Sequence, residues 1–130
     1  MLHIADAEHA ETSPDAPRLI VSKLVCSLVG SEETVSILPG SIAGRAYGEA
    51  RAREQFACNF GLNPIYRDQI FQGDFQATGF GPEGEVRLLE LAGHPFLVAA
   101  LFLPQVSSTP QHPHPLILAF IRAALKTSVR

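Results

Sequence analysis

A chain of 130 residues is long enough for one domain with a buried core but too short for two. Hydrophobic residues make up 46% of it and charged residues 18%, which is below the usual charged share of about 25%, so some apolar surface is expected to need a partner. The formal net charge is -3 and the basic residues are scattered singly, so the composition predicts no nucleic-acid partner.

The first 17 residues mix four acids with alanine and two prolines and show no hydrophobic period. We therefore expect an extended arm over 1–17 and a single domain over 18–130. No apolar segment at the start fits a signal peptide, and no run reaches the roughly 18 apolar residues of a membrane span. These features predict a cytoplasmic protein that does not bind membranes.

The positions of His and Cys in the sequence do not indicate a metal site or a redox-active disulfide. His3, His9 and the acids of the arm are interpreted as solvated side chains rather than metal ligands. Cys26 and Cys58 are far apart and lack the CxxC spacing, which favours two reduced thiols over a zinc site or a disulfide. We expect no metal and no cofactor.

The first half of the domain predicts short strands and one helix. Residues 18–29 are rich in β-branched side chains and indicate a strand or strand pair, which forms a hairpin with a return strand over 34–38. Ser41 and Gly48 are typical cap residues and bound a predicted helix over 42–47. The second half of 49–60 alternates polar and apolar residues, which predicts another strand.

The second half predicts two helices around a hairpin. Asn63 followed by Pro64 predicts a helix over 64–72 that ends at glycine 73. Residues 75–80 and 85–91 predict two strands joined through a Gly-Pro-Glu-Gly turn. Apolar residues at helical spacing over 115–126 predict a helix that packs on the sheet.

The longest apolar run, residues 96–103, lies between Pro95 and Pro104 and contains eight apolar residues. Such a run predicts a strand buried on both faces in the middle of a sheet, although a buried helical segment has the same pattern. Ligands usually bind where a central α/β strand ends, so Leu103, Pro104 and Gln105 occupy the place to search for chemistry. None of the three is chemically reactive.

Residues 90–125 read ELAGHPFLVAALFLPQ, then a loop rich in Ser and Pro, then HPLILAFIRAAL. This order resembles the C-terminal end of the class I glutamine amidotransferase domain of CTP synthase, whose pattern reads ELxxHPFFVGVQFHPEF, a Ser/Pro/Arg loop and SPLFxxFIxAA. The matching residues are Glu90, Leu91, His94, Pro95, Phe96, Val98, Phe102, Pro104, Ser107, Pro110, Pro113, Pro115, Leu116, Phe120 and Ile121.

Upstream, residues 40–59 are similar to the family's GTxAYxxYGxxxIxERxRHRYEVN, and residues 4–17 to the segment after its nucleophile helix. The residues that keep their places in the first of these are Gly40, Ala46, Tyr47, Gly48, Arg51, Arg53 and Asn59. The resemblance thus covers nearly the whole chain, but it covers only the second half of the family domain. It implies a partial class I glutamine amidotransferase-like (flavodoxin-like) α/β sheet, with helices packed on it and the N-terminal half missing.

The family hydrolyses glutamine with a Cys-His-Glu triad, in which an oriented base activates a thiolate. Carried over, the His falls on Leu103 and the Glu on Gln105, and the nucleophile turn precedes the start of this chain. The resemblance therefore implies a catalytically silent domain, a pseudoenzyme with a binding or structural role. The alternative is a glutamine-hydrolysing amidotransferase, supplying ammonia for CTP synthesis, that is active only in a longer product or with a partner chain.

Ligand binding is a separate question from catalysis. In the family's glutamine-binding RHRYE motif, Arg53 keeps the first position, whereas Gln55, Phe56 and Ala57 replace the second Arg, the Tyr and the Glu. Basic and amide side chains that remain are candidates for binding a glutamine-like small molecule. These candidates are Arg51, Arg53, Asn59 and Gln105.

Three further residue groups carry open alternatives. Cys58 with His94 as base is a conceivable nucleophile, against the commoner interpretation of a buried thiol and of a His94 ring that bonds backbone in a turn. His112 and His114 flank Pro113, and as a metal site they lack a third ligand. Finally, the missing half should leave the strand at 96–103 with an unpaired edge, so we expect a homodimer or association with another chain.

Overall fold

The structure, a computed structural model, describes residues 4–128 and contains two sheets. The larger sheet is antiparallel, with strand order β4-β3-β6-β7-β8. Its strands are β3 (Ser31–Ile37), β4 (Arg51–Phe56), β6 (Phe75–Phe80), β7 (Val86–Leu91) and β8 (Val98–Ala100). The predicted hairpin of two strands around residues 81–84 is confirmed as β6 and β7.

The smaller sheet contains β1 (Glu8–His9), β2 (Leu19–Lys23) and β5 (Phe60–Leu62), in the order β1-β2-β5. The expected hairpin of 18–29 with 34–38 is wrong, because β2 pairs with β1 and β5, whereas β3 pairs with β4 and β6. Between β2 and β3 the N–H groups of Leu24 and Leu28 bond the carbonyls of Asn59 and Cys58. These bonds tie the connection to residues that follow β4, so no direct return strand forms.

The helices lie outside the sheets. The predicted helix over 42–47 is confirmed as α1 (Ile42–Tyr47), in which Gly44 N–H donates to the Ser41 hydroxyl and Gly48 ends the helix at a φ of 70°. The buried carboxylate of Glu90 accepts the N–H groups of Ile42 and Ala43, each at 2.7 Å, and so fixes α1 against β7. The remaining helices are the 3-10 turn η1 (Pro64–Tyr66), α2 (Arg67–Ile70), α3 (Pro104–Ser107) and α4 (Pro115–Ser128).

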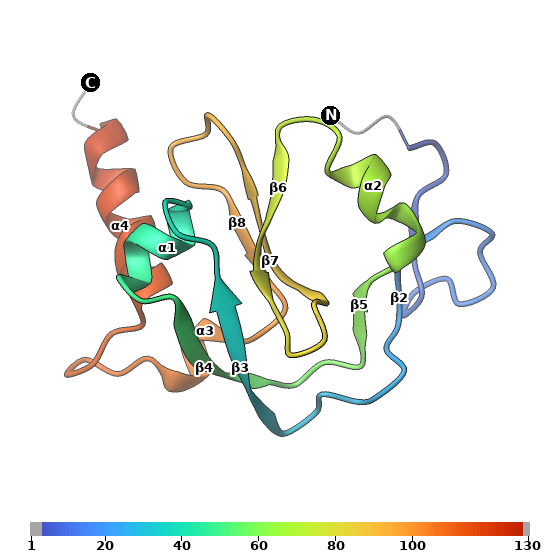
Figure 1. The fold of residues 1–130 in the computed structure, drawn as a ribbon, viewed down its shortest axis with the longest axis horizontal. Helices are drawn as coiled ribbons and strands as arrows, with labels where there is room; N and C mark the ends of the chain where they lie inside the picture. Colours follow the sequence, from blue (N-terminus) through green and yellow to red (C-terminus); the bar gives the residue numbers. More distant parts are fainter. Residues whose placement is uncertain (1–3, 129–130) are drawn as a thin grey trace.

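The helix predicted at 64–72 is therefore divided into η1 and α2, and the one predicted at 115–126 is confirmed as α4. In Figure 1, α1 and α4 lie together on one side of the larger sheet, and α2 lies with β2 and β5 on the other side. No described helix is long and apolar enough to cross a membrane.

The apolar run at 96–103 does not form a central strand. Only Val98–Ala100 is a strand, it lies at the edge of the sheet, and Ala99 and Ala100 are exposed. The expectation of a strand buried on both faces is thus wrong, because the apolar residues of the run lie in different surroundings. Val98 packs beside the core, whereas Phe102 leaves the sheet and is buried in the core itself.

Phe102 brings the chain back across the core to the opposite edge of the sheet. Its ring packs edge-to-face on Phe56 of β4, with 5.9 Å between the ring centroids. The next residue, Leu103, donates its N–H to the carbonyl of Gln55 at 3.1 Å. β4 and β8 are the two edge strands of the sheet. The segment that follows β8 therefore contacts the opposite edge strand, and the sheet curls around one core. The core residues are Leu28, Val35, Ile37, Ala43, Phe56, Leu88, Phe102 and Leu116.

Candidate functional site

The end of β8, singled out by the sequence, lies against β4. Leu103 is half-buried at the start of α3, with its backbone bonded to Gln55, and α3 contacts β4. Gln105, two residues later in α3, is exposed. The structure thus brings Leu103, in the position that the resemblance gives to the catalytic base, next to Gln55 of the glutamine-binding motif, and Gln105 follows in α3. None of their side chains titrates near neutral pH.

The ligand-binding candidates lie on the outer side of β4 and beyond it. Arg51 and Arg53 alternate with inward-facing residues and are exposed, and Arg53 forms an ion pair with Glu32 of β3. Asn59 is exposed past the end of β4. In the described residues, no hydrogen bond links Arg51, Arg53, Asn59 and Gln105 to one another, and none of them lines the cavities of about 680, 600 and 420 Å³.

Cys58 and His94 do not meet. The Cys58 thiol donates to the Phe60 carbonyl at 2.8 Å and accepts the Phe60 N–H at 3.3 Å. It follows β4 at the end where Phe56 pairs with Ser31, the first residue of β3. His94 instead lines a cavity of about 420 Å³ with Ser41 and Ile42, which come after the other end of β3. Its Nδ1 accepts the Phe96 N–H at 3.2 Å, the backbone role that was one of the two alternatives for this ring.

A buried ionisable cluster lies behind β4 and contains His114, which the sequence suggested only as half of an incomplete metal site with His112. Glu54 and His114 are 3% and 5% exposed, and the His114 Nε2 lies 3.0 Å from the Glu54 Oε1. The His114 Nδ1 accepts the Leu116 N–H at 3.2 Å, so the ring carries its proton on Nε2 and donates it to Glu54. The Tyr47 hydroxyl donates to the same carboxylate. The cluster links α1, β4 and the start of α4.

Burial of Tyr47, followed by its hydrogen bond to Glu54 and the negative charge of that carboxylate, raises the pKa of the phenol far above its usual value. His112, in contrast to His114, is exposed, so the two histidines do not share a site. Within residues 4–128 no group of three or more His, Cys, Asp or Glu side chains could hold a metal ion.

The phenol pKa predicts a loss of stability at high pH. An unfolded tyrosine releases its proton near its ordinary pKa of about 10, whereas folded Tyr47 retains it, so the folded chain binds more protons above that pH. The contribution of Tyr47 is fully present below about pH 10 and is lost as the pH rises further. Tyr47→Phe should therefore lose less unfolding free energy between pH 8 and pH 11 than the parent protein does, measured by urea unfolding.

Tyr66→Phe is the matched control, because the chain has two tyrosines and Tyr66 lies outside the buried cluster. It should retain the alkaline loss of the parent. Equal losses in the two variants would show that Tyr47 does not hold its proton through Glu54.

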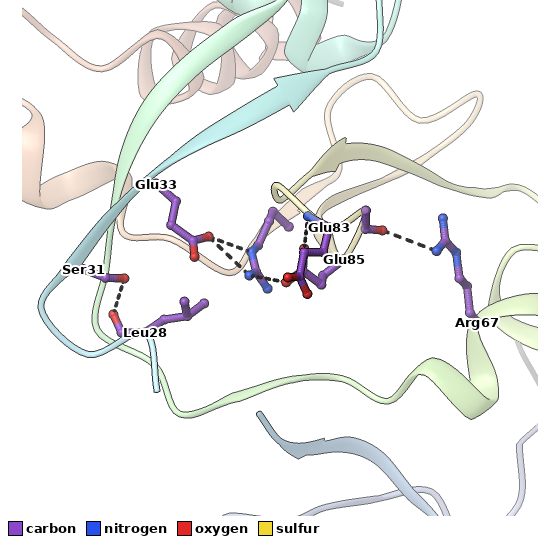
Figure 2. Close-up of polar contacts among 8 residues, drawn as sticks. Leu28, Ser31, Glu33, Arg67, Glu83 and Glu85 are labelled. Carbon is purple, nitrogen blue, oxygen red and sulfur yellow. Dashed lines mark hydrogen bonds and ion pairs between the residues drawn. The ribbon is translucent and has the colours of Figure 1, made fainter. Parts of the chain in front are cut away.

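A second ionic cluster surrounds Arg87 (Figure 2). Its side chain is 3% exposed, its Nε and Nη2 lie 3.3 and 3.2 Å from Glu33, and Nη2 lies 3.3 Å from Glu85. The guanidinium also lies over the Phe56 ring, 5.5 Å from its centroid. At the far end of the same view, Arg67 donates to the Gly84 carbonyl at 3.4 Å. The cluster therefore anchors the β6–β7 turn to β3 and α2.

This cluster lines a cavity of about 600 Å³ between the smaller sheet and the β6–β7 turn. The charges that line it are balanced, since Lys23, Arg67 and Arg87 face Glu33, Glu83 and Glu85. Arg87 already pairs with two carboxylates, those of Glu33 and Glu85, so we interpret the cluster as a structural element. Sequence reasoning missed it because single charged residues in strands carry no motif.

Comparison with known proteins assigns the chain to a protein family. No family model matches it. CTP synthase of Dehalococcoides mccartyi is 35% identical over 131 residues, which cover 92% of this chain and 24% of that protein. CTP synthase of a Synechococcus strain is 34% identical over 138 residues, covering 96% of this chain and 25% of that protein. The structure matches the glutaminase domain of Trypanosoma brucei CTPS with bound acivicin, at a TM-score of 0.88 and 21% identity.

The chain is a partial CTP synthase glutaminase-like domain. It spans about a quarter of the length of the curated relatives it matches. The structural match covers 97% of this chain and 53% of the Trypanosoma chain. The family resemblance and the partial α/β fold expected from the sequence are confirmed.

Proposed function

We propose that this glutaminase-like domain is catalytically silent by itself and has a binding or structural role. The observation that carries the proposal is the end of β8, where Leu103 and Gln105 stand in the positions that the resemblance gives to the base and its orienting carboxylate. Two further observations support it. The Cys58 thiol is bonded to the backbone of Phe60, away from His94, and the His114–Glu54 pair is too deeply buried for a substrate to reach.

The test is ammonia release from glutamine at neutral pH. We expect no release above background by the purified chain, because general base catalysis needs a titratable group at the reacting atom. Cys58→Ala and Cys26→Ala form a matched pair, since each removes one thiol and Cys26 is exposed. Release that scales with protein concentration and disappears in Cys58→Ala, but not in Cys26→Ala, would overturn the proposal.

A glutamine-like small molecule is the ligand we propose for the outer side of β4. Its carboxylate suits the guanidinium groups of Arg51 and Arg53, which bind carboxylates through paired hydrogen bonds. Asn59, six residues after Arg53, and Gln105 of α3, which contacts β4, add amide donors and acceptors. Calorimetric titration of glutamine into the same protein samples measures this binding without reference to turnover.

The edge of β8 favours a second candidate, an amidotransferase that is active in a longer product or with a partner chain. Within residues 4–128 no strand pairs with the outer edge of β8, and Ala99 and Ala100 are exposed there. Nearby on α4, Phe120, Ile121 and Leu125 are about half exposed. An uncovered strand edge with adjacent apolar surface is a site where another chain adds. The cytoplasmic location stays a prediction.

We expect light scattering to show association of the purified chain, most simply as a homodimer at twice the monomer mass. Ala99→Lys combined with Ile121→Lys should convert it to a monomer, because lysine on an edge strand opposes pairing and a charge on α4 opposes apolar contact. Val25→Lys is the control, since Val25 is fully exposed outside both sheets. A monomer of the parent chain at high micromolar concentration would contradict this expectation.

A further inference from the structure

The largest of the three cavities is a groove between α1 and α4, with a volume of about 680 Å³. Apolar side chains from three segments line it: Ile42 and Ala46 of α1, Phe96 before β8 and Leu118 of α4. All four are only half-buried, so the groove keeps apolar surface in contact with water. Its volume is in the range of about 300–1,000 Å³ that ligand pockets occupy.

The rim of the groove is positively charged. Arg45 lies on the α1 side, and Arg122 and Lys126 lie on the α4 side, one turn apart on the same face. No Asp or Glu is among the residues that line the groove. In residues 4–128 neither Arg122 nor Lys126 forms a salt bridge. This is a local excess of positive charge on a chain whose net charge is -3.

The groove combines an apolar floor with basic side chains at its rim, and this combination fits one kind of ligand. An amphipathic helix lays its apolar side chains into such a groove, and acidic side chains along its flanks pair with the basic residues at the rim. The apolar surface also continues from Phe96 to Phe120, whose rings lie 5.7 Å apart and T-shaped. We propose that the α1–α4 groove is a docking site for an acidic amphipathic segment of a partner protein.

The groove is separate from the end of β8 near β4, whereas its continuation to Phe120 adjoins the apolar surface of α4 beside the outer edge of β8. Neither Leu103, Gln105 nor Cys58 lines the groove, so its occupation does not depend on glutamine hydrolysis or on its absence. Loss of docking and the presence of glutaminase activity are therefore separate results.

The test uses a synthetic helical peptide of about 14 residues, roughly four turns, with leucine and one tryptophan on one face and glutamate on the flanks. The chain itself contains no tryptophan, so all tryptophan fluorescence reports on the peptide. We expect its emission to shift to shorter wavelength as the protein is added, because the indole enters the apolar groove. Raising the salt concentration should weaken binding, since the rim charges are exposed.

The double variant Arg122→Gln with Lys126→Gln should bind the peptide about fivefold more weakly, as expected for two exposed charge pairs. Lys23→Gln, which removes a charge at the other end of the molecule, should bind as the parent does. A control peptide with every glutamate replaced by glutamine should bind the parent protein about as weakly as the acidic peptide binds the double variant.

Three results would overturn the proposal. The first is no emission shift with the parent protein, and the second is equal binding by the double variant. The third is a dimer of the parent chain that the double variant alone converts to a monomer, which would make a second copy of this chain the occupant.

Discussion

Replacing His114 with leucine is expected to lower the free energy of unfolding by about 3 kcal/mol, measured by urea unfolding at pH 7. Glu54 is 3% exposed and receives a hydrogen bond from the His114 Nε2 at 3.0 Å. The substitution removes that donor and leaves a buried carboxylate bonded to Tyr47 without its imidazole partner. Breaking one side of a buried pair costs more than the pair itself contributes, because the remaining charge stays away from water.

The double variant Glu54→Leu with His114→Leu separates this cost from simple loss of packing. It should recover at least half of the lost stability, since apolar residues of similar size often replace a buried pair without penalty. His112→Leu, two residues away and exposed, should change the unfolding free energy by less than about 0.5 kcal/mol. An effect of His114→Leu no larger than that of His112→Leu would refute the account of the cluster.

Phe102→Ala is expected to cost about 3–5 kcal/mol, the range for removing a fully buried aromatic side chain. Phe102 is 2% exposed, and its ring packs on Phe56 and lies 6.2 Å from the ring of His114. Its loss opens a cavity where the chain returns from β8 to β4. For a domain near the lower limit of about 5 kcal/mol in total stability, little folded protein would remain.

Phe120→Ala is the matched control for Phe102→Ala. Phe120 is 55% exposed, and its T-shaped contact with Phe96 predicts a loss of about 1 kcal/mol or less. The dependence of unfolding free energy on urea should keep its slope in both variants if each unfolds in one step. Similar losses for the two phenylalanines would mean that Phe102 is not the centre of the core.

Local signals in the sequence predicted the elements that depend on neighbouring residues. The bounds of α1 follow from Ser41 and Gly48, whose cap conformations need no distant contact. The β6–β7 hairpin follows from its Gly-Pro turn. The hairpin predicted from 18–29 failed because the partner of a strand is chosen by tertiary contacts, and the run at 96–103 failed because a hydrophobic pattern does not tell an edge strand from a central one.

The candidate site was predictable only in part, for a related physical reason. Leu103 and Gln105 were found because they stand within a motif, and the structure places the backbone of Leu103 beside Gln55. Glu54 was missed because its burial depends on His114, which lies 60 positions later. Side chains alternate strictly between the two faces of β4, and Arg53 and Gln55 on either side of Glu54 are exposed. This alternation could have predicted that the Glu54 side chain faces inward.

The long separation between Glu54 and His114 has a consequence for synthesis on the ribosome. A chain emerges from its N-terminus, so β3, β4 and the β6–β7 hairpin are available well before Phe102 and His114. Until those two residues appear, the inner side of β4 has neither the ring that covers Phe56 nor the imidazole that bonds the Glu54 carboxylate. Packing that side early would bury an unpartnered charge, so the larger sheet should acquire its native core only after the start of α4 has left the ribosome.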